Sequence, residues 1–596
     1  SWSARAHSSP DRPSRYRVLA TSYGGNDARA EGRVSLPPMD LIETIREAVI
    51  GGHHVVPGPF GPRRVTYADY TASGRSLSFM EDYIRDVVLP LYANTHTESS
   101  GTGLQTSRFR EDAREIIRNS VGASEDHAVL FVGSGCTGAI DRMIRVLGLT
   151  IPDGLDDEYG FTDQIPRDKR PVVFIGPFEH HSNELPWRES IADVVKIGED
   201  SDGHINQDQL RKELEEYADR PLKIGSFSAA SNVTGIISDT QGIAELLHEH
   251  GALSFWDFAA AAPYVGIDMD PEGRPDARKD AIFLSTHKLI GGPGTPGLLV
   301  ARKELFTNRV PGVPGGGTVS FVQPDHHEYI TDIEHREEGG TPAIVESIRA
   351  GLVFQLKETV GAARIRELEE AFIDRAIASW SRNPDIEILG NPDADRLSIV
   401  SFVVRHEGTY LHHNFIVSLL NDLFGIQSRG GCSCAGPYGH ALLGIDIEHS
   451  DEIAHEVILG CEGIKPGWVR VNFNYFISDA VLDFIIEAVH LVATHGWKLL
   501  PWYEFCLETA TWQHVDGRGA APFSLADISY ESGDMSYTAP PHTASDSELA
   551  GYLEEARSLF DSIDPSDAPE QAPLHATASF EDLRWFLLPD EVRSGE

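Results

Sequence analysis

The sequence predicts an α/β protein built around a mostly parallel β-sheet. Between about residues 125 and 305, short apolar runs alternate with stretches of helical character, and strands separated by helices are typical of a parallel sheet covered on both faces. Ligand-binding residues of such sheets gather just past the carboxyl ends of the strands. The expected strands are 128–133, 171–176, 222–228, 252–257, 281–285 and 297–301.

The chain is long enough for more than one domain, because 596 residues exceed what one compact core accommodates. A smaller α/β domain is expected from apolar strands at 397–404 and 468–473 and from helices near 411–424 and 479–494. The last hundred residues are acidic, rich in Pro, Ser and Asp, and carry no catalytic motif. We expect a flexible tail over 1–36, a large domain over 37–345, the smaller domain over 346–495 and an acidic extension over 496–596.

Composition and charge exclude several functions. The formal charge of −41 argues against a nucleic-acid partner, whose phosphates require clustered Lys and Arg. No run of about 18 uncharged apolar residues is present, so no membrane partner is expected. Five cysteines in so long a chain do not make a disulfide framework, and we expect a reducing, cytoplasmic setting. We assign no set of metal ligands.

Lys288 is the last residue of the sequence STHK (285–288), which begins at the end of the expected strand 281–285. A loop rich in Gly and Pro follows it. A lysine at a strand end inside such a sheet is unusual, because burying an ammonium group is costly. The cost disappears if the amine forms a Schiff base, which is how pyridoxal 5′-phosphate is attached to proteins. Considered alone, a lysine in this position is more often a surface lysine at a turn.

Two further strand ends give Lys288 chemical partners. Asp257 ends the preceding run, where its carboxylate can keep a pyridine nitrogen protonated; its alternative role is to cap the next helix. The turn at 133–138, GSGCTG, opens a helix with small residues that expose backbone N–H groups to a phosphate, and Thr137 adds a hydroxyl. Such glycine-rich turns also serve tight packing alone.

The ordered set of motifs resembles the cysteine desulfurase and selenocysteine lyase group of class V aminotransferase-like enzymes. The resemblance covers about residues 65 to 490, and its strength lies in the order and spacing of the motifs together. The matching motifs are YADYTAS (67–73), GSGCTGAID (133–141), EHHSNELPW (179–187), SNVTG (231–235), WDFAAA (256–261), STHKL (285–289), GGTP (339–342), RGGCSCA (429–435) and WVR (468–470).

The resemblance implies a fold type I architecture with pyridoxal 5′-phosphate held on Lys288, which would also carry protons to and from the substrate. In this pattern His180 stacks on the pyridine ring and assists proton transfer. Asp257 pairs with the pyridinium nitrogen and Asn232 approaches the phenolic oxygen. The positions that usually surround the phosphate are Gly135, Cys136, Thr137, Ser285 and His287.

The resemblance also implies how substrate and subunits are held. Arg470 would bind the α-carboxylate of a small amino-acid substrate, for which its bidentate geometry is suited; an ordinary surface ion pair is the alternative. Thr341, in the GGTP turn, would reach the phosphate of a neighbouring subunit. We therefore expect a homodimer with shared active sites.

Cys434 aligns with the cysteine that, in desulfurases, takes sulfur from the substrate as a persulfide. That chemistry requires an exposed loop thiol with thiolate character, to which Arg429 could contribute, and Gly430 and Gly431 would let the loop move. A small buried side chain is the alternative, but the polar, glycine-rich surroundings favour the catalytic role. The leading hypothesis is a desulfurase that converts cysteine, or selenocysteine, to alanine and passes sulfur to an acceptor protein.

Several positions depart from the family pattern. The family usually has Gln where this chain has Ala260, and a hydroxyl residue is common at the position of Cys136. Cys432 adds a second thiol, and an insertion near 151–168 is foreign to compact members. These departures motivate a second hypothesis, an aminotransferase, epimerase or C–S lyase acting on a specialised amino acid. A third, a non-catalytic binding protein, is disfavoured because Lys288, Asp257, His180 and Arg470 are all retained.

Overall fold

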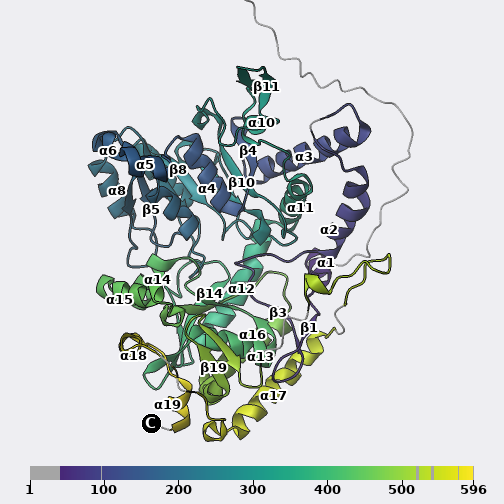
Figure 1. Cartoon of the computed structure of the whole chain (residues 1–596), viewed down its shortest axis with the longest axis vertical. Coiled ribbons are helices and arrows are strands. Elements are labelled where there is room, and N and C mark those ends of the chain that lie inside the picture. The colour runs from purple at the N-terminus through teal and green to yellow at the C-terminus, as the bar shows by residue number, and fades with distance from the viewer. Residues whose placement is uncertain are drawn as a thin grey trace, which may run out of the picture. The chain divides into compact units, whose positions relative to one another are not determined.

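The structure is a computed structural model that describes residues 40–95, 97–517, 523–538, 543–572, 574 and 576–594 (Figure 1). By their contacts, residues 41–596 form one compact unit. The tail expected over 1–36 lies outside the described residues, and the division of the remainder into a large and a smaller domain stays a prediction.

A seven-stranded sheet lies at the centre of the part that resembles the desulfurases. Its strand order is β4 (His127–Val132), β10 (Gly297–Arg302), β9 (Ala281–Ser285), β8 (Leu253–Asp257), β7 (Lys223–Ser228), β5 (Val172–Ile175) and β6 (Asp193–Lys196). Only β10 runs antiparallel to its neighbours. All six strands expected from the sequence form. Strand β6 is an additional strand that was not expected, because this half-exposed edge strand lacks a continuous apolar run.

Alternate residues of these strands enter two hydrophobic cores, one on each face of the sheet. Val129 and Phe131 belong to one core, whereas Ala128 and Leu130 belong to the other. The first core is covered by α3 (Gly101–Ser120), α8 (Gln207–Glu216), α9 (Thr240–Glu249) and α11 (Ile344–Val360), and the second by α4 (Gly135–Val146) and α7 (Leu185–Arg188). This two-sided burial is the arrangement that parallel sheets require, and it confirms the α/β prediction.

A second, antiparallel sheet follows α11 and α12 (Ala362–Trp380). Its strands are β13 (Ile386–Ile388), β14 (Ile399–His406), β18 (Trp468–Asn472) and β17 (Arg429–Gly431), with β15 (Thr409–Leu411) paired to β14. Helices α13 (His413–Phe424) and α16 (Asp479–His495) share its core. The strands and helices expected in this part of the chain are therefore present, within a few residues.

The stretch Asp479–Trp502 is the one helical segment within the described residues that is long and apolar enough to cross a membrane. More than half of its apolar window (56%) is buried inside the protein. Its side chains Leu482, Ile485 and Val489 belong to the core of the second sheet. The segment is therefore buried as a core helix of the protein is.

The C-terminal extension packs onto the second sheet, as the yellow ribbon in the lower part of Figure 1 shows. It contributes Trp512, Tyr552, Phe560 and Phe586 to the same core. Its elements are the helical turn Gly496–Trp502, β19 (Tyr503–Cys506), β20 (Thr511–His514), α17 (Leu549–Ser562), α18 (Ala578–Leu583) and α19 (Pro589–Ser594).

The remaining elements connect and flank these layers. They are α1 (Leu41–Ala48), β1 (Val55–Val56), β2 (Arg63–Arg64), β3 (Thr66–Tyr67), α2 (Ser78–Tyr83), α5 (Asp153–Tyr159), α6 (Phe161–Gln164), β11 (Val319–Val322), β12 (His327–Tyr329), α10 (Ile333–Glu337), β16 (Ile426–Gln427), α14 (Gly436–Leu443) and α15 (Ile447–Ile458).

Candidate active site

A cavity of about 240 Å³ lies at the carboxyl ends of the strands of the main sheet. Residues from the second sheet and its loops close the cavity from the other side. It brings together every site residue expected from the sequence except Thr341: Gly135, Cys136, Thr137, His180, Asn232, Asp257, Ser285, His287, Lys288, Cys434 and Arg470. These motifs, which are far apart in the sequence, therefore lie together in the structure, whereas the role of each residue stays a prediction.

Lys288 and Asp257 come from the ends of adjacent strands. Asp257 ends β8 and Lys288 closes the short turn Thr286–Lys288 that follows β9. The backbone N–H of Ala259 donates to Asp257 Oδ1 at 2.7 Å. Burial raises the pKa of the Asp257 carboxyl and lowers the pKa of the Lys288 ammonium group. Both groups are therefore driven toward their neutral forms unless a bound group supplies a partner.

The other end of the cavity is formed by the start of α4. Gly135 has a φ of 55°, and a Cβ added there would lie 2.7 Å from Ser285 Oγ, so glycine is required for this close approach. The backbone N–H of Cys136 donates to Ser285 Oγ at 2.9 Å, and the hydroxyl oxygens of Thr137 and Ser182 are 2.6 Å apart. Hydroxyl groups and the N-terminus of a twelve-residue helix thus surround this end.

His180 is held as a neutral imidazole by its surroundings. Burial lowers its pKa to about 4, and the nearby positive charge of Lys288 acts in the same direction. Ser182 N–H donates to His180 Nδ1 at 3.1 Å. The turn itself is anchored by Glu179, whose Oε2 accepts hydrogen bonds from Ser228 Oγ at 2.7 Å and from Asn183 Nδ2 at 2.6 Å.

Arg470 enters the cavity from β18 and is almost fully buried, with 3% exposure. Its Nη2 donates to Asp69 Oδ1 at 2.9 Å and its Nη1 donates to the carbonyl of Asn232 at 2.9 Å. The second oxygen of Asp69 accepts from Arg429 Nε, also at 2.9 Å. Asp69 was given no role from the sequence, although it lies inside the YADYTAS motif; only the fold reveals that it holds two arginines.

Cys434 is exposed and lies on the wall of the cavity that contains Lys288. Ser433 and Cys434 have positive φ values of 52° and 57°, which hold the loop in a tight bend. Two hydrogen bonds tie the bend to the site: Asn232 Nδ2 donates to Ser433 O, and His181 N–H donates to Cys434 O, both at 2.9 Å.

The C-terminal extension supports the strand that leads to this loop. The ring of Trp585 stacks on His413 with centroids 5.8 Å apart and an interplanar angle of 10°. A Cβ added at Gly430, in β17, would lie 3.2 Å from His413 Cδ2. Burial lowers the pKa of His413 to about 3, so the stacked ring is neutral. Trp585, His413 and β17 therefore form three successive layers behind the cysteine loop.

Thr341 lies outside the cavity of its own chain. Its side chain is exposed, and its Oγ1 accepts a hydrogen bond from Asn94 Nδ2 at 3.2 Å. A role of Thr341 in a neighbouring subunit stays a prediction.

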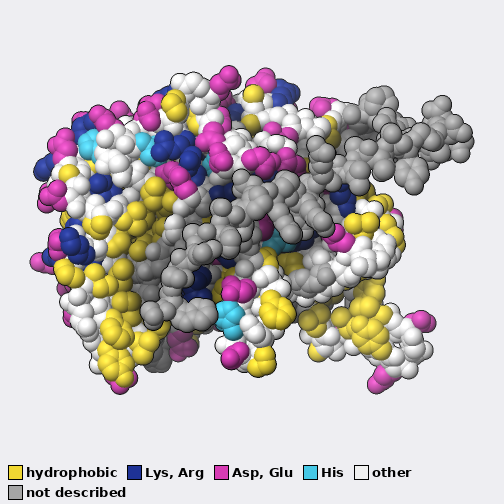
Figure 2. All heavy atoms as spheres, turned by 90° about the horizontal axis from the view of Figure 1, so that it is seen from above, with side chains coloured by type: hydrophobic (Ala, Val, Ile, Leu, Met, Phe, Trp, Pro, Cys, Tyr) yellow, Lys and Arg dark blue, Asp and Glu magenta, His cyan; other side chains and the backbone are white. Residues whose placement is uncertain are grey.

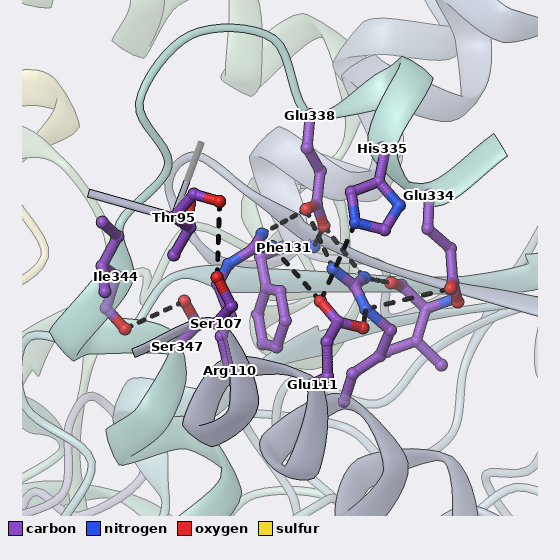
Figure 3. Close-up of polar contacts among 12 residues, drawn as sticks. Thr95, Ser107, Arg110, Glu111, Phe131, Glu334, His335, Glu338, Ile344 and Ser347 are labelled. Atoms are coloured by element: carbon purple, nitrogen blue, oxygen red, sulfur yellow. Dashed lines mark hydrogen bonds and ion pairs between the residues drawn. The ribbon is translucent and has the colours of Figure 1, made fainter. Parts of the chain in front are cut away.

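The turn that carries Thr341 follows an anchored glutamate pair (Figure 3). Arg110, Arg114 and Arg118 repeat every four residues along one face of α3. Arg110 and Arg114 bind Glu338, the latter at 3.0 Å, and Arg118 binds Glu334 at 2.8 Å. Burial alone would raise the pKa of Glu338, but the two arginines hold it to about 2. This network fixes the start of the turn against the main sheet.

The residues of the cavity fit pyridoxal 5′-phosphate. Thr71 and Ser433 line the cavity. Their hydroxyl oxygens are buried and have no hydrogen-bond partner among the described residues. Hydroxyl and backbone donors gather at the start of α4, where a phosphate would be held. Asp257 lies where it can pair with a protonated pyridine nitrogen, which is the partner that its burial demands. A Schiff base would likewise remove the cost of burying the charge on Lys288.

Comparison with solved structures places the fold among the cysteine desulfurases. The structure titled as the apo cysteine desulfurase from Thermococcus onnurineus superimposes with a TM-score of 0.60 at 21% identity, covering 77% of this chain and all of that one. A cysteine desulfurase from Escherichia coli gives a TM-score of 0.55 at 20% identity, covering 71% and 93%. These likenesses show a fold type I architecture.

The sequence comparisons then identify the family. The model of the aminotransferase class-V family matches residues 66–448. A probable cysteine desulfurase of Halobacterium salinarum is 25% identical over 433 residues, covering 72% of this chain and 92% of the relative, and one of Staphylococcus aureus is 28% identical over 383 residues, covering 63% and 84%. The chain belongs to the aminotransferase class-V family, whose members are pyridoxal-phosphate enzymes.

Proposed function

We propose that this protein is a pyridoxal-phosphate-dependent cysteine desulfurase that uses Cys434 to accept sulfur. The observation that carries the proposal is that the exposed thiol of Cys434 lines the same cavity as Lys288, Asp257 and Arg470. The relatives described as probable cysteine desulfurases support it. Selenocysteine, which differs from cysteine only in the chalcogen, is a second expected substrate.

Pyridoxal phosphate would supply an electron sink that stabilises negative charge at the substrate Cα. Arg470 would bind the substrate α-carboxylate, displacing part of its contact with Asp69. Lys288, whose burial favours the neutral amine, would hold the cofactor and then take the Cα proton. His180, neutral at physiological pH, would stack over the cofactor ring and hold a proton at its free nitrogen.

Cys434 would complete the sulfur transfer. Its thiolate attacks the substrate sulfur, so that the C–S bond breaks, an S–S bond forms, and the carbon gains a proton to give alanine. The enzyme is left with a persulfide on Cys434, and the sum of atoms is one cysteine and one thiol giving one alanine and one persulfide. An acceptor protein would then remove the terminal sulfur.

The chain offers a matched pair of thiols for the test. Cofactor-loaded protein is given cysteine, and alanine and protein persulfide are measured. We expect Cys434→Ala to abolish persulfide formation while the visible absorption of the bound cofactor is retained, and Cys432→Ala to remain active. Undiminished sulfur release by the Cys434→Ala variant would exclude the persulfide mechanism, and Lys288→Ala serves as the variant without covalent cofactor attachment.

One observation favours a second function. Ala260 lines the cavity at the position where the family usually has Gln, which leaves room and removes a hydrogen-bond donor near Asn232. An aminotransferase, epimerase or C–S lyase for a larger amino acid would use this room. Screening amino acids for changes in cofactor absorption distinguishes the two functions. No spectral change with cysteine, together with a change on adding another amino acid, would support the second function.

We further propose that the active unit is a homodimer. Thr341 is exposed and outside its own cavity, and the β11–β12 hairpin exposes Phe321 and Val322, each 62% accessible. Figure 2 views the protein from the side on which β11 and α10 lie in Figure 1, and patches of hydrophobic side chains are visible on this face. Sedimentation of the purified protein tests the proposal; a monomer that is fully active would contradict it.

A further inference from the structure

A second cavity, of about 410 Å³, lies on the far side of the segment that contains Asp69. Its lining shares no residue with the active-site cavity. It is enclosed by α1 and the turn after it, by the segment 64–75, by 476–481 and by Ser545 and Asp546 of the extension. Nothing in the proposed reaction uses this space.

Three arginines line the cavity: Arg46, Arg64 and Arg75. Arg64 is 7% exposed and forms an ion pair with Asp546, with 2.6 Å between Arg64 Nη1 and Asp546 Oδ1. Across the ranges that the structure describes, neither Arg46 nor Arg75 has an acidic side chain within 4 Å. This is unexpected in a chain with 91 acidic and 50 basic residues.

Backbone carbonyls hold both unpaired arginines in place. Arg46 Nε donates to Phe476 O at 2.6 Å, and Arg75 Nη2 donates to Ile50 O at 2.8 Å. A Cβ on Gly51, which has a φ of 82°, would collide with Arg75 Nη2. The backbone therefore makes room for this guanidinium group. Each of the two arginines retains N–H groups beyond those held by a carbonyl, since a guanidinium has five donors.

Aromatic rings stand beside the arginines in a lining that also includes the carboxylate of Glu47, which lies 4.0 Å from His53 Nε2. The guanidinium carbon of Arg75 lies 5.1 Å from the centroid of the Tyr67 ring. Tyr70 contacts Tyr67 edge-on, with centroids 4.8 Å apart, and contacts Phe476 at 5.3 Å. A stacked guanidinium keeps its planar edge of N–H donors available for an anion.

We propose that this cavity is a binding site for a small anion that carries phosphate or carboxylate groups. Two guanidinium groups without carboxylates, fixed at one cavity and backed by aromatic rings, provide the charge and the bidentate donors that such an anion requires. The three arginines of the lining outnumber its two carboxylates, Glu47 and Asp546, so the cavity keeps a net positive charge for the anion. Asp546 does not compete, because it is already engaged by Arg64 and accepts a hydrogen bond from Ser478 Oγ at 2.8 Å.

The anion site is joined directly to the segment that carries Lys288. Gly74 N–H donates to His287 O at 2.8 Å, and Gly291 N–H donates to Arg75 O at 2.7 Å. Arg75 and its neighbour Gly74 thus fix the backbone on either side of Lys288. A bound anion would therefore order a segment shared by both cavities.

The test uses the cofactor-loaded full chain, in which the cofactor phosphate already occupies its own site. Inorganic phosphate and succinate are titrated separately by isothermal calorimetry in a buffer without other polyanions, which distinguishes a phosphate site from a dicarboxylate site. We expect saturable binding of at least one probe, weakened at least about tenfold by Arg46→Met and by Arg75→Met. Arg85→Met is the matched control, because Arg85 is exposed and pairs with Asp82 and Asp86.

A second measurement does not depend on affinity in the variants. Phenylglyoxal modifies accessible arginines, and peptide mapping of the wild-type protein shows whether the bound probe protects Arg46 and Arg75 but not Arg85. Absence of saturable binding by either probe, or binding that is unchanged in both cavity variants, would overturn the proposal. The result is independent of whether the enzyme acts on cysteine.

Discussion

Asp69 and Arg470 form a buried ion pair beside the active-site cavity, and the distance between Asp69 Oδ1 and Arg470 Nη2 is 2.9 Å. The partners are 401 residues apart in sequence. Since the second oxygen of Asp69 binds Arg429, one carboxylate orients both guanidinium groups that line the cavity. Its single negative charge compensates one of the two positive charges and leaves the other for a substrate carboxylate.

Asp69→Asn is expected to impair substrate binding more than catalysis. The amide keeps the size of the side chain but removes the charge that orients Arg470, so we predict a KM at least about tenfold higher, equivalent to ~1.4 kcal/mol. Steady-state kinetics with the responsive amino acid checks the split between KM and kcat. An unchanged KM would mean that Asp69 has only a structural role, and retained cofactor absorption controls for misfolding.

Trp585→Ala is expected to slow sulfur transfer to Cys434. Loss of the ring that stacks on His413 removes the layer behind β17, and we expect a decrease of about 2 kcal/mol in the free energy of unfolding. Persulfide formation should fall while cofactor absorption stays unchanged. Trp497→Ala is the matched control, because Trp497 also stacks on a histidine, His406, with centroids 4.7 Å apart; an equal loss in both variants would refute a specific role for Trp585.

Glu338→Gln is expected to destabilise the protein by about 3 kcal/mol at neutral pH, because it leaves Arg110 and Arg114 buried without their charge partner. The pKa of Glu338 is lowered from 4.5 to about 2, so the stabilising contribution is complete above pH 4.5 and is lost as the pH falls toward 2. Thermal unfolding across this range should show the two proteins converging in acid. Glu111→Gln, which alters a half-exposed partner of Arg114, should cost less than 1 kcal/mol.

Ala260→Gln distinguishes the two candidate functions. If the enzyme is a cysteine desulfurase, the added amide should leave cysteine turnover equal or faster and should shift the cofactor absorption through a new hydrogen bond. If the room beside Asn232 serves a larger substrate, turnover of that substrate should fall at least about tenfold. Rates with cysteine and with the best amino acid of the screen, measured on both proteins, decide between them.

Much of the main sheet could be predicted because its strands are buried on both faces and appear as continuous apolar runs. The edge strand β6 could not, since its half-exposed residues lack that pattern. The convergence of Lys288 and Asp257 followed from one rule about parallel strand ends. The contacts of Asp69 with Arg470 and of Trp585 with His413 join segments more than 150 residues apart, and no local pattern encodes such pairs.

The core of the second sheet contains Ala68 and Phe586 together with residues from the region between them. A ribosome must therefore translate more than 500 further residues after Ala68 before this core can be completed. Until then the apolar faces of β14, β18 and α16 lack part of their cover, and such incomplete intermediates are prone to aggregate. The acidic extension thus makes assembly of the cysteine loop's support one of the last events in the synthesis of the enzyme.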